Sequence, residues 1–168
     1  MADGSGTAVN VFLSLGSNIA PEKHLRMACR ELTNDYGDLM LSSVYENAPV
    51  GFSGNNFLNM VVGFATAEEP ERIVNRIERL HRKAGRVRYS DPFSSRTLDL
   101  DLLLYGDVVR RRPMLPREDI EKYGFVLEPL AEVAPELRHP VSGVTMQAIW
   151  GDFDQQEHPM TKVDIGVN

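Results

Sequence analysis

The stretch TLDLDLLL, residues 97–104, alternates apolar and acidic residues over its first half. Because alternate side chains of a β-strand lie on one face, the leucines of this alternation are predicted to lie on one face of a strand. Asp99 and Asp101 then project together from the opposite face, with Cα atoms about 6–7 Å apart. Oxygen ligands at this spacing can hold Mg²⁺, although a solvent-facing strand with polar alternation gives the same pattern.

The elements around this strand indicate the fold. Their order is strand, helix, strand, strand, helix, strand, which predicts an α+β fold, a ferredoxin-like split βαβ (βαββαβ) antiparallel sheet. We expect both helices on one face, the other face free for a ligand, and short C-terminal additions, since the prolines after residue 112 leave room only for short helices. The expected elements are strand Val11–Leu15, helix Pro21–Gly37, strands Leu39–Tyr45 and Phe57–Ala65, helix Pro70–Gly85 and strand Thr97–Leu104.

The bulk composition predicts a cytoplasmic protein with no nucleic-acid or membrane partner, and we expect a monomer. The 168 residues carry a net charge of −6, whereas general nucleic-acid binders usually have a basic excess. Cys29 is the single cysteine, and no stretch of 18 apolar residues occurs. We expect residues 1–9 to form a flexible leader, residues 10–155 one domain and residues 156–168 a C-terminal tail.

A second predicted strand places an aromatic ring and a carboxamide on the same open face. In residues 57–64 the apolar even positions belong under the helices, which leaves Phe57 and Asn59 on the other side. A flat heteroaromatic ligand can stack on Phe57 while Asn59 donates to and accepts from its amide edge. An ordinary exposed aromatic residue is the simpler alternative.

Basic side chains gather beside this face on an otherwise acidic chain. Residues 79–96 hold 6 of the 18 Lys and Arg, and among them Arg86, Arg88 and Arg96 flank one polar loop. Phosphoryl transfer needs metal ions, cations on the phosphate oxygens and an aligned attacking hydroxyl. No glycine-rich phosphate loop occurs, so side chains and metals are expected to hold a nucleotide, with loop 87–95 closing over it.

Several motifs together resemble one family, the 6-hydroxymethyl-7,8-dihydropterin pyrophosphokinases. The run RTLDLDLLLYG at residues 96–106 resembles the signature of that family, and the similarity covers roughly residues 10–150. Further matching segments are LGSN at 15–18, FLN at 57–59, GRVR at 85–88 and GFVL at 124–127.

The resemblance implies an ATP-dependent diphosphotransferase of folate biosynthesis. The hydroxymethyl oxygen of the pterin would attack the β-phosphorus of ATP, giving AMP and the pterin diphosphate. Asp99 and Asp101 would bind two Mg²⁺ ions. The other roles that it implies are pterin contacts for Asn47, Val50, Phe57, Asn59 and Phe125, action on the transferring group for Arg86 and Arg96, and nucleotide contacts for Arg88, Arg96, Leu102, Arg112 and Arg117.

Four positions depart from the pattern of many members, and two further functions stay open. Arg117 and Glu118 replace a His and an aromatic residue, Tyr123 replaces an Arg, and His81 replaces a Glu. These changes leave room for a catalytically weak pterin-binding or regulatory paralogue. An RNA-binding ferredoxin-like domain is the third hypothesis, but it requires a basic surface where this chain has two aspartates. His81 is predicted to lie on the helix surface.

Overall fold

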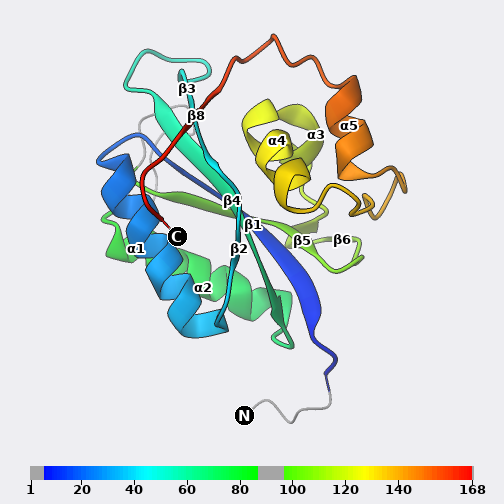
Figure 1. The fold of residues 1–168 in the computed structure, drawn as a ribbon. Helices are drawn as coiled ribbons and strands as arrows, with labels where there is room; N and C mark the ends of the chain where they lie inside the picture. The colour runs from blue at the N-terminus through cyan, green and yellow to red at the C-terminus, as the bar shows by residue number, and fades with distance from the viewer. Residues whose placement is uncertain (1–5, 87–96, 168) are drawn as a thin grey trace.

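The computed structural model describes residues 6–86 and 97–167, in which one six-stranded antiparallel sheet carries helices on both faces (Figure 1). A separate two-stranded ribbon is formed by β6 and β7. The elements are β1 (Val9–Ser17), α1 (Pro21–Tyr36), β2 (Met40–Leu41), β3 (Val44–Asn47), β4 (Phe57–Thr66), α2 (Pro70–Lys83), β5 (Asp99–Tyr105), β6 (Arg110–Arg111), β7 (Met114–Leu115), α3 (Asp119–Lys122), α4 (Gly124–Val133), α5 (Met146–Asp152) and β8 (Thr161–Val163).

The predicted ferredoxin-like order is confirmed, with one strand divided in two. The main sheet runs β5-β1-β4-β3-β8, and β2 pairs with β4 beside β3. The single strand expected over residues 39–45 is wrong in detail, because Ser42 interrupts it between β2 and β3. The Ser42 backbone N–H donates to the Val61 carbonyl at 3.0 Å, and the Ser42 hydroxyl accepts the Val61 N–H at 2.9 Å. The side chain thus replaces one ladder acceptor and lets the strand bend.

The helices α1 and α2 pack on the sheet face that carries the alternating leucines of β5, as predicted. Each helix begins at a proline, whose fixed φ suits the first helical position. Leu25 and Leu32 of α1 are seven residues apart, and Ile73 and Ile77 of α2 are four apart, so each pair lies on one helix face. They form one buried cluster with Leu100. Full burial of each such side chain contributes about 1.5–3 kcal/mol.

The opposite face of the sheet is only partly free, which corrects the expectation of an uncovered face. Helices α3, α4 and α5 cover one end of it (Figure 1), and Leu127 packs there in a second core with Phe12 and Val61. The register of β1 and β5 shifts at the same end of the sheet, between Phe12 and Leu13. Beyond the shift, both Leu103 and Leu104 belong to the second core, so the alternation that begins at residue 98 ends there. The uncovered remainder holds Asp99 and Asp101.

The C-terminal segment returns to the sheet. Residues 156–168, which the sequence sets apart as a tail, contain β8, and β8 pairs antiparallel with β3 (Figure 1). Arg26 of α1 donates from Nε and Nη2 to the Ile165 carbonyl at 2.9 and 2.5 Å. Ile165 itself is buried in the core between the sheet and helices α1 and α2, which we call the helix-side core. This segment therefore closes one edge of the sheet. Across residues 6–86 and 97–167, no helix has the length and apolar character needed to span a membrane.

Candidate active site

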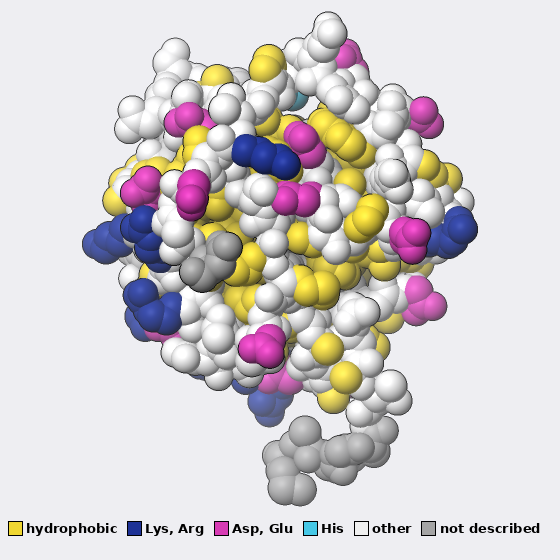
Figure 2. All heavy atoms as spheres, in the orientation of Figure 1, with side chains coloured by type: hydrophobic (Ala, Val, Ile, Leu, Met, Phe, Trp, Pro, Cys, Tyr) yellow, Lys and Arg dark blue, Asp and Glu magenta, His cyan; other side chains and the backbone are white. Residues whose placement is uncertain are grey.

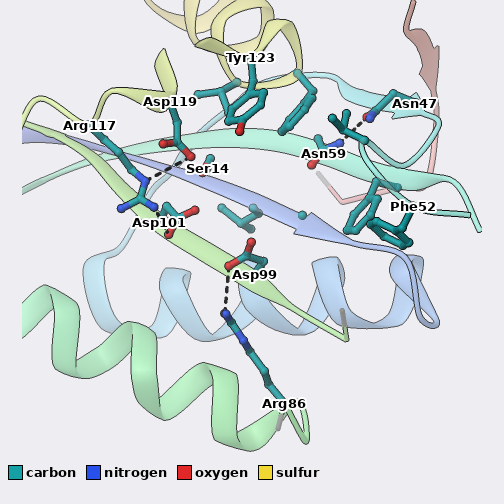
Figure 3. Close-up of a pocket in the computed structure, with 16 residues that line it drawn as sticks. Ser14, Asn47, Phe52, Asn59, Arg86, Asp99, Asp101, Arg117, Asp119 and Tyr123 are labelled. Carbon is teal, nitrogen blue, oxygen red and sulfur yellow. Dashed lines mark hydrogen bonds and ion pairs between the residues drawn. The ribbon is translucent and has the colours of Figure 1, made fainter. Parts of the chain in front are cut away.

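The uncovered part of the second sheet face forms one side of an open cavity of about 400 Å³ (Figure 3). Strands β1, β4 and β5 line it from the sheet, and the residues from 117 to 126 line it from the side of α3 and α4. The cavity therefore joins segments that are distant in sequence. The predicted site residues that line it are Asn47, Val50, Phe57, Asn59, Arg86, Asp99, Asp101, Arg117 and Phe125.

Two aspartates of β5 project into this cavity, and an arginine lies against each. Arg86, which follows α2, donates from Nη1 to Asp99 Oδ1 at 2.9 Å. Arg117 Nη2 lies 3.5 Å from Asp101 Oδ1, while its Nε lies 3.4 Å from Asp119 Oδ2. Within residues 6–86 and 97–167, the buried Arg117 Nε has no hydrogen-bond partner. Arg117 and Asp101 therefore meet at ion-pair distance.

The electrostatics around Asp101 favour an additional cation. Burial, followed by the nearby charge of Asp99, raises the pKa of Asp101 to about 7. A carboxylate with a raised pKa is poorly stabilised in its charged form. A divalent cation between the two carboxylates would supply the missing charge, and oxygen is the ligand type that Mg²⁺ prefers. The donor set therefore fits Mg²⁺.

The protein supplies few metal ligands by itself. Among the described residues, no group of three or more His, Cys, Asp or Glu side chains is placed to hold a metal ion. Mg²⁺ is commonly bound through one or two carboxylates plus substrate phosphates and water. Asp99 and Asp101 meet that requirement without a further protein ligand.

The other end of the cavity is a fixed amide corner. Asn59 Nδ2 donates to Asn47 Oδ1 at 2.5 Å, which joins β4 to the end of β3. Gly16 lies opposite Asn59 across the β1–β4 ladder, and a Cβ at Gly16 would come within 2.6 Å of Asn59 Oδ1. Only glycine therefore leaves the Asn59 carboxamide in this position. The amide group presents hydrogen-bonding atoms to a ligand while one of its own donors is already satisfied.

Aromatic rings surround the amide corner. Phe52 meets Phe57 edge to face, with ring centroids 6.2 Å apart. Tyr123 stacks on Phe125 with centroids 5.0 Å apart and planes inclined by 19°. These rings and Val50 line the same cavity as Asn59. Apolar rings beside a carboxamide suit a flat heteroaromatic ligand with an amide-like edge.

Some predicted residues lie elsewhere. Leu102 is buried in the helix-side core, and Arg112 is exposed; neither lines the cavity. Arg88, Arg96 and loop 87–95 with its expected closure lie outside the described residues. Conversely, Phe52 and Asp119 line the cavity although the sequence did not predict them as site residues, and Tyr123, noted there only as a departure from the family pattern, lines it too. Phe52 and Asp119 lie two residues from predicted contacts, which is the signal that could have found them.

His81 is not on the helix surface, so the sequence prediction for it is wrong. It is one of the buried residues of α2, with 7% of its surface exposed. Its Nε2 accepts the backbone N–H of Leu100 at 2.9 Å. Periodicity could not reveal this, because the partner is a backbone group on a strand 19 residues away.

The fold is that of a ferredoxin-like α+β protein, and its cavity places two carboxylates and two guanidiniums beside a carboxamide and several aromatic rings. The family model described as 7,8-dihydro-6-hydroxymethylpterin-pyrophosphokinase (HPPK) matches residues 12–135. The chain belongs to this family.

Relatives of similar length carry names that correspond to the same family. Proteins named 2-amino-4-hydroxy-6-hydroxymethyldihydropteridine pyrophosphokinase include one from Haemophilus influenzae, 30% identical over 93% of this chain and 99% of its own length. Another, from Porphyromonas gingivalis, is 37% identical over 77% of this chain and 93% of its own length.

A solved structure supports the fold. The HPPK-DHPS protein of Plasmodium falciparum, as a triple mutant, superposes with a TM-score of 0.68 at 12% identity over 88% of this chain. The present chain corresponds to 42% of that longer one.

Proposed function

We propose that this protein transfers diphosphate from ATP to the hydroxymethyl group of 6-hydroxymethyl-7,8-dihydropterin in folate biosynthesis. The observation that carries the proposal is one cavity that joins an amide and aromatic corner to two carboxylates and two guanidiniums. The first set suits the pterin, and the second suits the magnesium complex of ATP. Membership of the HPPK family agrees with both assignments.

At the pterin end, the Asn59 carboxamide hydrogen-bonds the amide edge of the ring, and Phe57 and Phe125 contact its two faces. The bond between Asn59 and Asn47 fixes the orientation of the amide before the substrate arrives. Val50 and Phe52 close the side of this corner. Less side-chain freedom is then lost on binding, which favours affinity.

At the phosphate end, the pterin hydroxyl oxygen attacks the β-phosphorus of ATP. The new bond joins that oxygen to the β-phosphorus, the bond from the β-phosphorus to the α,β-bridging oxygen breaks, and AMP leaves with the bridging oxygen. The hydroxyl proton passes to solvent. Mg²⁺, which we propose as two ions held by Asp99 and Asp101, supplies charge stabilisation for the phosphates. Arg86 and Arg117 place positive charge beside them, and Arg96 is proposed to join Arg86.

The surface charge agrees with small-molecule partners. On the face that Figure 2 shows, Lys and Arg side chains are interspersed with Asp and Glu and form no broad basic area. A nucleic-acid-binding face usually concentrates basic side chains. We propose a cytoplasmic monomer, and size-exclusion chromatography with light scattering tests its oligomeric state.

The decisive experiment is incubation of the purified protein with ATP, Mg²⁺ and 6-hydroxymethyl-7,8-dihydropterin. We expect stoichiometric AMP and pterin diphosphate, and no AMP when either the pterin or Mg²⁺ is left out. Calorimetric titration with the pterin and a non-hydrolysable ATP analogue runs in parallel. Pterin binding without AMP release would overturn the enzyme and favour a binding module.

A further inference from the structure

His81 stands at the open edge of the main sheet, beside the two aspartates. Among the described strands, β5 is the last in the order and pairs with β1 on one side. At an edge, alternate backbone N–H groups lack a strand partner. The N–H of Leu100, the residue between Asp99 and Asp101, instead donates to His81 Nε2 at 2.9 Å. The imidazole therefore takes the place of a neighbouring strand at this point.

The same histidine also holds Arg86. The Arg86 backbone N–H donates to the His81 carbonyl oxygen at 3.0 Å. The Arg86 guanidinium lies against the ring, with Nη1 3.1 Å from His81 Nε2, 3.3 Å from His81 Nδ1 and 2.9 Å from Asp99 Oδ1. One buried residue thus contacts both the arginine and the strand that carries the aspartates.

The hydrogen bond from Leu100 indicates the tautomer of this ring. Since Nε2 accepts the Leu100 N–H, the proton of the neutral imidazole lies on Nδ1. Nδ1 lies 3.5 Å from Glu78 Oε1, at the exposed side of α2. Burial, followed by the charge of Arg86, lowers the pKa of His81, which keeps the ring neutral. A neutral acceptor beside a guanidinium avoids repulsion between two cations.

We propose that His81 is a positioning residue, which aligns Arg86 with the Asp99–Asp101 segment so that guanidinium and carboxylates meet the phosphates of ATP together. This inference rests on the proposed function. His81 is not among the residues that line the cavity, so it is placed behind the residues that would meet the substrate. It acts through its contacts with the Arg86 guanidinium and the Leu100 N–H.

Two amide substitutions isolate the positioning contact. His81→Gln keeps an acceptor near the position of Nε2, whereas His81→Asn carries the same amide on a chain too short to reach the Leu100 N–H. A displacement of about 1 Å at a reacting centre can cost on the order of 10²-fold in rate. We therefore expect His81→Asn to lower kcat by about 10- to 100-fold while the Kd for the pterin stays within about 3-fold. His81→Gln should recover most of the lost rate.

The direct readout is the Leu100 amide. Its hydrogen exchange, followed by NMR in the Mg²⁺-loaded protein, should accelerate in His81→Asn and remain near the parent rate in His81→Gln. His139 provides a matched control, because it is also buried and its Nδ1 accepts the Val141 N–H at 3.2 Å, outside the cavity. His139→Asn should lower thermal stability without a selective loss of kcat.

The outcomes distinguish failure of the proposed function from failure of the positioning role of His81. If the parent protein releases no AMP, the proposed function fails, and the inference fails with it. If the parent is active and His81→Asn and His81→Gln have equal kcat values, the positioning role is wrong while the proposed function stands. The same conclusion follows if Leu100 exchange accelerates in His81→Asn and kcat does not change.

Discussion

Two clusters in this molecule each pair an arginine with a carboxylate, but they differ in how fully the carboxylate is hydrogen-bonded. On the side of α1 and α2, Arg76 Nη2 donates to Glu68 Oε1 at 2.6 Å, and the Tyr36 hydroxyl donates to Glu68 Oε2 at 2.8 Å. In the cavity, Arg117 only approaches Asp101, at 3.5 Å. The hydrogen bond from Arg76 lowers the pKa of Glu68. Burial raises the pKa of Asp101.

The difference separates a structural cluster from a functional one. The charge of Glu68 is satisfied by its neighbours, and the cluster connects α1, α2 and, through the Tyr105 hydroxyl that donates to the Glu68 carbonyl, β5. The charge of Asp101 is incompletely satisfied, as expected for a group that receives a metal ion with the substrate. Substitutions around Asp101 should therefore lower activity and leave stability intact, whereas substitutions around Glu68 should lower stability and leave activity intact.

The largest expected effect follows from Asp101→Asn. The isosteric amide removes the charge that holds Mg²⁺, and loss of metal charge stabilisation costs several kcal/mol of barrier, about 10³-fold or more in kcat. Stability at pH 7 should stay level or rise by about 1 kcal/mol, since a poorly stabilised buried charge is gone. Steady-state AMP release and urea unfolding measure the two quantities.

Asp99→Asn serves as the companion variant in the same strand. It should lose comparable activity, but it also loses the negative charge that pairs with Arg86, so no gain in stability is expected. If Asp101→Asn retains near-normal activity at millimolar Mg²⁺, the carboxylate pair is not the metal site.

The second prediction concerns the arginine that pairs with Asp99. Arg86→Ala should lower kcat by about 10²- to 10³-fold, because an electrostatic contact that strengthens in the transition state appears in the rate. The Kd for the pterin should remain within about 3-fold of the parent value. Arg110→Ala, at a surface arginine that pairs with Glu71 outside the cavity, is the matched control. A loss of pterin affinity with an unchanged rate would contradict the role of Arg86.

Much of the fold follows from side-chain periodicity, and the exceptions have identifiable causes. The alternation in residues 97–102 and the helical spacing from Pro21 and from Pro70 depend on local geometry, so the helix-side core was predictable. The cover over the second face was not, because it depends on how the short helices α3, α4 and α5 of a proline-containing segment pack against distant strands. Pairing of β8 with β3 joins residues more than 100 positions apart, which no local pattern encodes.

The site residues also divide into those that local alternation predicts and those that depend on distant partners. Asp99, Asp101, Phe57 and Asn59 were predictable as residues that share a sheet face, and the structure brings them into one cavity. His81 could not be placed, since its partners are a backbone N–H on another element and a guanidinium beyond its own helix.

The third prediction tests the amide corner at the opposite end of the cavity. Asn59→Ala should weaken pterin binding by about 10- to 100-fold, because the lost hydrogen bonds serve the substrate in ground and transition states alike. Its kcat at saturating pterin should change much less than in Arg86→Ala. Gly16→Ala should mimic this defect, since its Cβ would collide with Asn59 Oδ1. Calorimetric titration with the pterin gives the affinities, and a larger change in kcat than in Kd would contradict the assignment.

The smallest effect on catalysis is expected from Glu68→Gln, which removes the charge that pairs with Arg76. Its Kd values and kcat should match the parent within about 2-fold, while stability at pH 7 falls by about 1.5–3 kcal/mol, the usual contribution of charged hydrogen bonds. Because the folded-state pKa of Glu68 lies below its unfolded value, the stabilisation is present above the unfolded pKa of about 4.3 and is lost as pH falls through the folded pKa.

Urea unfolding of the parent and Glu68→Gln between pH 7 and pH 3 therefore tests both the size and the sign of this effect. The stability gap between the two proteins should be widest near neutral pH and should narrow below about pH 4. Asp35, which faces the other side of Arg76 at 3.2 Å, provides the control, because Asp35→Asn leaves the Glu68 bonds in place. If the gap stays constant across this range, the Glu68 charge is not what stabilises the cluster. If activity falls together with stability, the two clusters are not independent.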